Sequence, residues 1–456
     1  YDAIPRERLD NLQAEWRRFP RWRKGRVKVF THLYEYLIFP LHKLAAMGTR
    51  LAEARTRERF VRAISGLHAE GGIENRMDIF TLVVVGLVII TALTFDFTNG
   101  FHDTANSIAT GALKPKTAVI AAGTLNLIGA FLSTEVANTI SGGIINEQQV
   151  AIGPEFILAG LLGAIIWNLL TWLVGLPSSS SHALFGGLVG AVIVGAGVEG
   201  VNFAAVATKV LIPALVSPVV AGLAAFCATR LIYAIVKRMK EGEVESGFRH
   251  GQTITACLVA LSHGTNDAQK TMGIITLALI AVGAQPSGSD PQIWVIAACG
   301  LTIAAGTYMG GWRVIRTLGK GLTEINTPQG FAAEASSATT ILVSSHLGFA
   351  LSTTQVCSGS IIGSGLGKKG SVVNWSVAGR MLIAWLVTFP AAGIVGAAAC
   401  ALTKTGFAGV IATVVLALIA GFVIFRLSRR NPVNSMNVND QADVKLNAEP
   451  ATAHAA

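Results

Sequence analysis

The sequence predicts an all-α polytopic membrane protein, an inverted repeat of two halves with discontinuous helices, re-entrant hairpins and about 10–12 transmembrane helices. Only 14% of the 456 residues are Asp, Glu, Lys or Arg, whereas soluble proteins carry about 25%. Hydrophobic residues make up 52%, and 49 glycines suit helices that approach closely in lipid. This composition excludes a disordered chain, a coiled coil and a secreted disulfide scaffold. A duplicated set of polar motifs predicts the two halves.

Apolar segments follow one another closely from Met77 onward. A full span needs ~20 apolar residues, and several segments are shorter or are interrupted by Gly, Pro, Asn or Asp. A broken backbone is tolerated in a membrane only where protein or a watery cavity covers it, so these segments predict discontinuous helices and hairpins. We expect spans near residues 79–98, 117–137, 153–175, 183–198, 204–236, 252–262 with 271–285, 292–311, 330–350, 356–366, 376–401 and 406–427.

The order of apolar and polar stretches predicts five segments. Lys and Arg are frequent in the hydrophilic stretch between the two halves, which places it in the cytoplasm. The basic N-terminal segment is a solvated extension, an amphipathic element on a membrane surface, or a piece foreign to the natural protein, whose start would then be Met77. The segments are 1–76 (basic extension), 77–236 (first transmembrane repeat), 237–251 (cytoplasmic loop), 252–430 (second transmembrane repeat) and 431–456 (disordered polar tail).

The five cysteines show no paired spacing, and each lies in or beside an apolar stretch. We therefore expect small core residues rather than disulfides or metal ligands. They are Cys227, Cys257, Cys299, Cys357 and Cys400.

Two polar motifs occur once in each half and in the same order. Asn99–Ser107 (NGFHDTANS) resembles His263–Thr271 (HGTNDAQKT), so that Asp103 aligns with Asp267 and Asn106 with Lys270. The second pair is PSSSSH, residues 177–182, and ALSTTQ, residues 350–355. A weaker third pair relates the Phe and Glu of Phe131–Glu135 to those of Phe331–Glu334. Polar elements repeated in order are typical of secondary transporters built from repeats.

The duplicated motifs carry a coherent chemistry. Asp103 and Asp267 lie against spanning segments, where a carboxylate is costly unless compensated, so each is a candidate cation ligand or proton carrier. Asn106 and Asn266 add neutral oxygens that suit a small hard cation. The hydroxyl clusters at 178–181 and 352–354 lie where helices are expected to start, and helix N-termini favour anions. The two halves together therefore predict a donor-rich anion site near the middle of the membrane.

Each element also has a purely structural interpretation, and other function classes compete with transport. Ser and Thr clusters often only bond to helix carbonyls, and a buried Asp or His often completes a packing contact. An intramembrane hydrolase using Ser178–Ser181 with His182 as base is disfavoured, because adjacent side chains on one turn point apart and Gln355 replaces the His in the second half. A receptor that binds phosphate without moving it is disfavoured by the repeat symmetry.

The motifs resemble those of the inorganic phosphate transporter (PiT) family over residues 78–427. Segments 99–107 and 262–271 are similar to its duplicated signature, G-A-N-D-x-x-N, and the stretch from Trp167 to His182 is similar to its first hairpin motif. The resemblance implies import of inorganic phosphate by cation symport through alternating access, an inverted-repeat fold and a homodimer. It implies no enzyme activity, cofactor, resident metal or nucleic-acid partner, and a multi-pass location in the cell's inner (plasma) membrane.

The resemblance also implies roles for individual residues. Expected phosphate-binding residues are Ser179, Ser180, Ser181, Ser352, Thr353, Thr354 and Asn266. Expected coupling-ion or proton residues are Asp103, Asp267, Asn106, Glu135 and Glu334, to which the chemistry of their own side chains adds His102 and Lys270.

Departures from the family pattern bear on the coupling ion. His102 stands where the signature usually has Asn, and Lys270 stands where Asn is common. A fixed lysine could occupy the charge position that Na⁺ fills elsewhere, so these changes favour H⁺ over Na⁺ as the coupling ion. The alternative substrate is sulfate, which has the same shape. Phosphate is favoured, because it carries protons at neutral pH and can donate them to Asp103 and Asp267.

Overall fold

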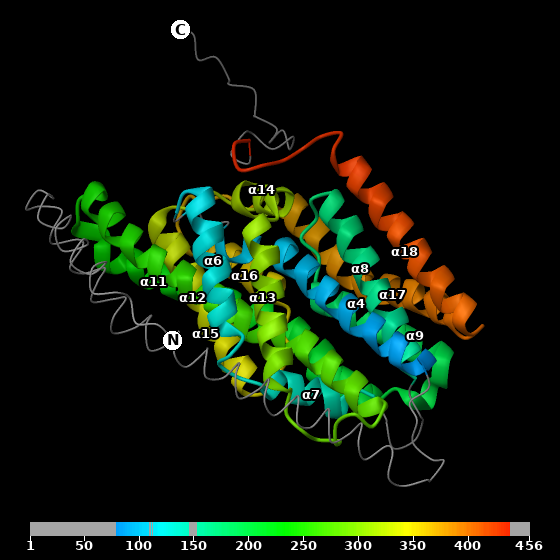
Figure 1. Ribbon diagram of the computed structural model, residues 1–456. Helices are drawn as coiled ribbons and strands as arrows, with labels where there is room; N and C mark the ends of the chain where they lie inside the picture. The colour runs from blue at the N-terminus through cyan, green and yellow to red at the C-terminus, as the bar shows by residue number, and fades with distance from the viewer. Residues whose placement is uncertain (1–78, 109–110, 112, 146–152, 438–456) are drawn as a thin grey trace, which may run out of the picture. The chain divides into compact units, whose positions relative to one another are not determined.

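In the computed structural model the described residues are 79–108, 111, 113–145 and 153–437 (Figure 1). The expectations for residues 1–76 and for the tail beyond 437 lie outside them. The described part is helical, with two isolated backbone bridges. Its main helices are α4 (Ile79–Asp103), α5 (Ala105–Ile108), α6 (Pro115–Gly129), α7 (Glu135–Gly143), α8 (Pro154–Leu173), α9 (Ser180–Ala196), α10 (Phe203–Ala205), α11 (Ile212–Ile235), α12 (Glu241–Ala281), α13 (Ile293–Met309), α14 (Trp312–Gly321), α15 (Thr327–His346), α16 (Thr353–Gly367), α17 (Trp375–Thr403) and α18 (Phe407–Ser428). Short helical turns lie at Val198–Gly200 and Val236–Arg238, and a π-helical stretch, Val206–Leu211, leads into α11.

The helices bury polar side chains and expose apolar ones, as lipid requires. Large apolar side chains cover the outer faces of α11, α17 and α18, for example Leu215, Ile383 and Leu418. By length and composition, five of the described helices could cross a membrane, or six if α13 and α14 form one bent span. Helix α16, which carries one of the polar motifs, has 15 residues and is too short to meet this criterion. The chain is a multi-pass, all-α membrane protein.

The helices of the two halves correspond in order, α6 to α9 with α13 to α16 and α11 with α17, whereas α18 has no counterpart among the described helices of the first half. The α8–α9 hairpin of the first half matches the α15–α16 hairpin of the second, and each is framed by an equivalent bridge. Ile145 pairs with Val201 in the first half, and Thr323 pairs with Val373 in the second. The residue after each bridge, Asn202 or Asn374, caps the helix that follows.

The halves are interlocked through exchanged helices. Helix α11, from the first half, packs on α15 and α16, whereas α17, from the second half, packs on α8 and α9. In the same way α6 packs on α12, and α13 packs on α4. Figure 1 shows α4, α8 and α18 side by side. Neither half therefore completes its own core, and each hairpin is held by a long helix from the other half.

Equivalent glycines permit these contacts. A Cβ on Gly186 of α9 would lie 2.2 Å from the carbonyl oxygen of Phe389, and one on Gly359 of α16 would lie 2.3 Å from that of Pro218. One turn further on, a Cβ on Gly363 would lie 1.9 Å from the carbonyl oxygen of Gly222. Backbone thus lies directly on backbone, which is the packing that small residues allow in membranes.

Three sequence expectations need correction. Helix α12 runs without a break through residues 263–270, because the polar side chains there find partners inside the protein. It begins at Glu241, so most of the expected 237–251 loop is helical. The proposed pairing of Glu135 with Glu334 is wrong, because α7 corresponds to α14 whereas Glu334 lies on α15, the counterpart of α8.

All five cysteines are free thiols. Cys299, Cys357 and Cys400 are buried, as expected for core residues. Cys257 is half-buried and Cys227 is exposed on α11, so the core assignment is wrong for Cys227. The residues around Cys227 in the sequence are apolar because they form a lipid-facing surface. A lipid-facing surface and a protein core are both apolar, so the sequence alone does not distinguish them.

We expect Gly363→Val to destabilise the protein, because the added side chain must push α16 away from α11 at Gly222. Overpacking of this kind typically costs about 1–3 kcal/mol. Thermal unfolding of the purified protein in detergent measures the effect. Gly86→Val is the matched control, since nothing lies within 4 Å of a Cβ at Gly86. Equal melting temperatures for the two variants would contradict the interlocked packing.

Candidate functional site

The N-termini of α9 and α16 supply hydroxyl groups in the interior of the protein. Ser179 caps α9, its hydroxyl accepting a hydrogen bond from the backbone N–H of His182 at 3.2 Å. Ser352 caps α16 in the same way, accepting from the N–H of Gln355. Both helices therefore begin at the predicted motifs. Their first turns direct hydroxyls and the positive end of the helix dipole at the buried site.

Asp103, at the end of α4, is buried and surrounded by donors. Ser180 donates to its Oδ2 at 2.8 Å, and Thr354 donates to its Oδ1 at 3.1 Å. His102 Nδ1 lies 2.6 Å from Oδ1. The ring's Nε2 lies 3.4 Å from the hydroxyls of Thr171 and Ser178. Hydroxyls from both hairpins thus meet one carboxylate.

Asp267, on α12, is compensated by fixed charge. Lys270 Nζ lies 2.5 Å from its Oδ1, and His263 Nε2 lies 3.1 Å from its Oδ2. The same lysine donates to the hydroxyl of Ser181 at 2.6 Å and to the carbonyl of Leu351 at 2.7 Å. A single ammonium therefore connects α12 to both hairpin motifs.

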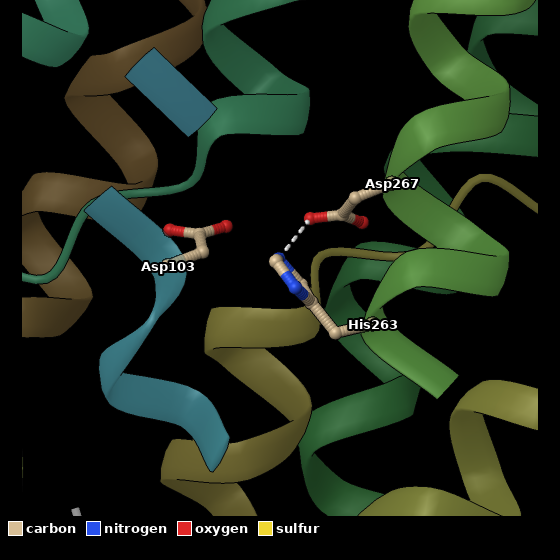
Figure 2. A group of neighbouring side chains, drawn as sticks. All are labelled: Asp103, His263 and Asp267. Atoms are coloured by element: carbon tan, nitrogen blue, oxygen red, sulfur yellow. Dashed lines mark ion pairs between the residues drawn. The ribbon is translucent and has the colours of Figure 1, made fainter. Parts of the chain in front are cut away.

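Thr353 joins the two carboxylates. Its hydroxyl lies 3.1 Å from Asp267 Oδ2 and 3.4 Å from Asp103 Oδ2. Figure 2 shows Asp103 on α4 pointing toward Asp267 and His263 on α12. Ligand atoms of these three buried residues lie within 4.8 Å of one another, close enough to share one cation. The two signature motifs therefore form one site.

The two signature asparagines take different positions. Asn106, on α5, donates to the hydroxyls of Thr353 and Thr354, each at 3.3 Å, so it supports the same cluster. Asn266 instead donates to Ser345 at 2.9 Å, on α15. Asn266 therefore stabilises the second hairpin, and its amide is not hydrogen-bonded to Asp103 or Asp267.

The structure does not bring the two glutamates into this cluster. Glu135 is exposed at the start of α7. Glu334 is buried on α15, where its Oε2 accepts a 2.6 Å hydrogen bond from Thr255. Their expected part in transport stays a prediction.

Two residues of the site were missing from the predicted set. A buried histidine often only completes a packing contact, yet His263 contacts Asp267. Asn99 was quoted in the motif but given no role, although its amide lies 3.4 Å from Asp267 Oδ2. The available signal was spacing, since His263 and Asp267 are four residues apart and share a helix face.

Removal of Lys270 should leave Asp267 as an undercompensated buried charge. Breaking a buried ion pair typically costs about 3–5 kcal/mol, so Lys270→Met should lower the melting temperature strongly. The double variant Lys270→Met/Asp267→Asn should recover most of the loss, because no charge is left unpaired. Thermal unfolding of the three proteins measures both effects. A double variant less stable than Lys270→Met alone would contradict this assignment.

Comparison with known proteins now identifies the family. The Phosphate transporter family profile matches residues 99–396. A protein of Mycobacterium bovis named "Probable low-affinity inorganic phosphate transporter" is 53% identical over 374 residues, covering 80% of this chain and 89% of its own. One of the same name from Bacillus subtilis is 42% identical over 327 residues, covering 71% and 98%.

A solved structure is also similar. It is described as "The sodium-dependent phosphate transporter" and matches with a TM-score of 0.64 at 25% identity, covering 71% of this chain and 99% of its own. The similar proteins are named for phosphate, which leaves the sulfate alternative without support. The chain belongs to the Phosphate transporter family and is a transporter rather than an enzyme.

Proposed function

We propose that this protein imports inorganic phosphate by symport with H⁺, through alternating access around the site at Asp103 and Asp267. The observation that carries the proposal is the Thr353 hydroxyl, which contacts a carboxylate from each half. A ligand held there touches both halves at once. Rocking of one half against the other would then expose it to either side of the membrane.

The hydroxyls around the carboxylates supply what phosphate recognition needs. Ser180, Thr353 and Thr354 now donate to carboxylate oxygens. They can turn to donate to phosphate oxygens instead, with Ser179, Ser181 and Ser352 beside them at the helix starts. Phosphate carries one or two protons at neutral pH, so its own O–H groups can donate to Asp103 and Asp267. Moderate, neutral donors allow release as well as capture.

The fixed charges of the site favour H⁺ over Na⁺. The Lys270 ammonium already lies against Asp267, and His102 lies against Asp103. Hard cations prefer oxygen ligands, whereas one of the three groups that could share a cation is the imidazole of His263. Imidazoles next to carboxylates suit proton exchange better than the all-oxygen shell of a hard cation.

Two broader expectations complete the proposal. The protein works in the cell's plasma membrane, consistent with its multi-pass apolar helices. It forms a homodimer, as the resemblance to the PiT family implies. Its partners are phosphate, the coupling proton and the lipid bilayer.

Radiolabelled phosphate uptake into proteoliposomes tests the coupling ion. An imposed inward pH gradient should drive accumulation without Na⁺, because the fixed lysine already occupies one cation position. A Na⁺ gradient at equal pH should drive none above background. Uptake that requires Na⁺ and ignores the pH gradient would contradict the proposal.

Thr353→Val should raise the KM for phosphate by about 10-fold or more, since a hydrogen bond to a charged group contributes about 1.5–3 kcal/mol. Initial rates of uptake over a range of phosphate concentrations give the value. Thr339→Val is the matched control, because the Thr339 hydroxyl is exposed and bonds only to its own helix, at Ala335. Identical KM values for the two variants would remove Thr353 from the phosphate site.

A further inference from the structure

We propose that Asp96 is a proton-binding site that couples proton movement to phosphate transport; this inference rests on the proposed symport. Asp96 lies on α4, outside both duplicated motifs and outside the cluster at Asp103. It has no exposed surface. No role follows for it from the anion site, yet it is buried in the same helical bundle as Asp103, Asp267 and Glu334.

The surroundings of Asp96 favour a group that gains and loses a proton. Its Oδ1 accepts a 3.0 Å hydrogen bond from Thr271 on α12. Its Oδ2 has no hydrogen-bond partner among the described residues. An ionised carboxylate with only neutral donors beside it, the Thr271 hydroxyl and the backbone of Ile303, is costly within a membrane, whereas the protonated form replaces the charge with an O–H donor. Asp103 and Asp267 differ, because several donors or cations compensate each of them.

The charged groups around Asp96 do not neutralise it. Those that face it within the described residues are Asp267 and Lys270 from α12 and the thiol of Cys299 from α13. The Lys270 ammonium is already bonded to Asp267, Ser181 and Leu351. Among the described residues no other cation faces Asp96, so a proton is the simplest way to remove its charge.

Polar residues on the facing sides of α4 and α12 connect Asp96 to the phosphate site. Asp96, Asn99 and Asp103 lie at positions i, i+3 and i+7 of α4, so they share a face over about 10 Å of helix. On the facing helix, Thr271 follows Asp267 by one turn. The amide of Asn99 reaches Asp267 Oδ2, and its Oδ1 is a second buried acceptor without a partner among the described residues. A proton leaving Asp96 thus has polar groups on both helices leading to the paired carboxylates.

Repeat symmetry argues against a merely structural role. The offset that aligns Asp103 with Asp267 places Ala260 opposite Asp96, and Ala260 is buried on α12. The second half therefore folds with an apolar residue at the equivalent position. An aspartate is present at this position in one half only, as expected for a group that carries a proton rather than one that holds the fold together.

Asp96→Asn separates coupling from phosphate binding, because the amide keeps the shape and loses the exchangeable proton. Two assays on proteoliposomes are compared: accumulation driven by a pH gradient, and exchange of labelled for unlabelled phosphate without any gradient. We expect accumulation to fall by about 10-fold or more, as for loss of a typical coupling free energy. Exchange should remain, since the anion site is intact.

Three results would overturn the proposal. Accumulation equal to that of the wild type shows that Asp96 carries no coupled proton. If accumulation and exchange fall equally in a variant with an unchanged melting temperature, Asp96 contributes to phosphate binding instead. If Asp96→Asn does not fold, Asp96→Glu replaces it, and an unchanged pH profile of accumulation counts against the proposal. Wild-type protein that ignores the pH gradient refutes the symport itself, so the two failures are distinguishable.

Discussion

The structure depends on the cost of burying two carboxylates, Asp103 and Asp267, against each other inside a membrane protein. Neither can remain charged there without donors or cations close by. Hydroxyls of the two hairpins approach one carboxylate, and Lys270 with His263 approaches the other. These groups belong to the first turns of α9 and α16 and to the middle of α12, which packs on helices of both halves. The positions of α9, α16 and α12 are therefore set by a local electrostatic requirement.

The long-range packing serves this requirement. Helices α11 and α17 each pack against the hairpin of the other half. Glycines at the contacts let the backbones approach closely. The two halves are nearly equivalent in this scaffold and unequal in their chemistry. Asn106 in the first half corresponds to Lys270 in the second, and Asp96 corresponds to Ala260. We infer that this combination of a symmetric scaffold and asymmetric charges links proton movement to phosphate movement at the proposed anion site.

Much of this arrangement could be predicted from the sequence, because motifs that recur in order must occupy equivalent places. Asp103, Asp267 and the hydroxyls at 179–181 and 352–354 were identified in this way, as were the helix starts after the hairpin turns. Periodicity could not predict that α12 runs unbroken through its polar motif, because partners from other helices satisfy it. The pairing of Glu135 with Glu334 rests on only a Phe and a Glu in each segment, which is too little to align them. Asn99 and Asp96 needed coordinates, since their importance arises from contacts between α4 and α12, whereas His263 could have been found from its spacing to Asp267 on one helix.

The central claim is that both halves build one phosphate site whose occupancy is linked to protons. Calorimetric titration of the purified protein with inorganic phosphate, repeated in buffers of different ionisation enthalpy, tests it most directly, because binding linkage is reciprocal. The account predicts one phosphate per chain, net proton uptake on binding and no requirement for Na⁺. Two phosphates per chain, or binding that needs Na⁺ and takes up no protons, would contradict it.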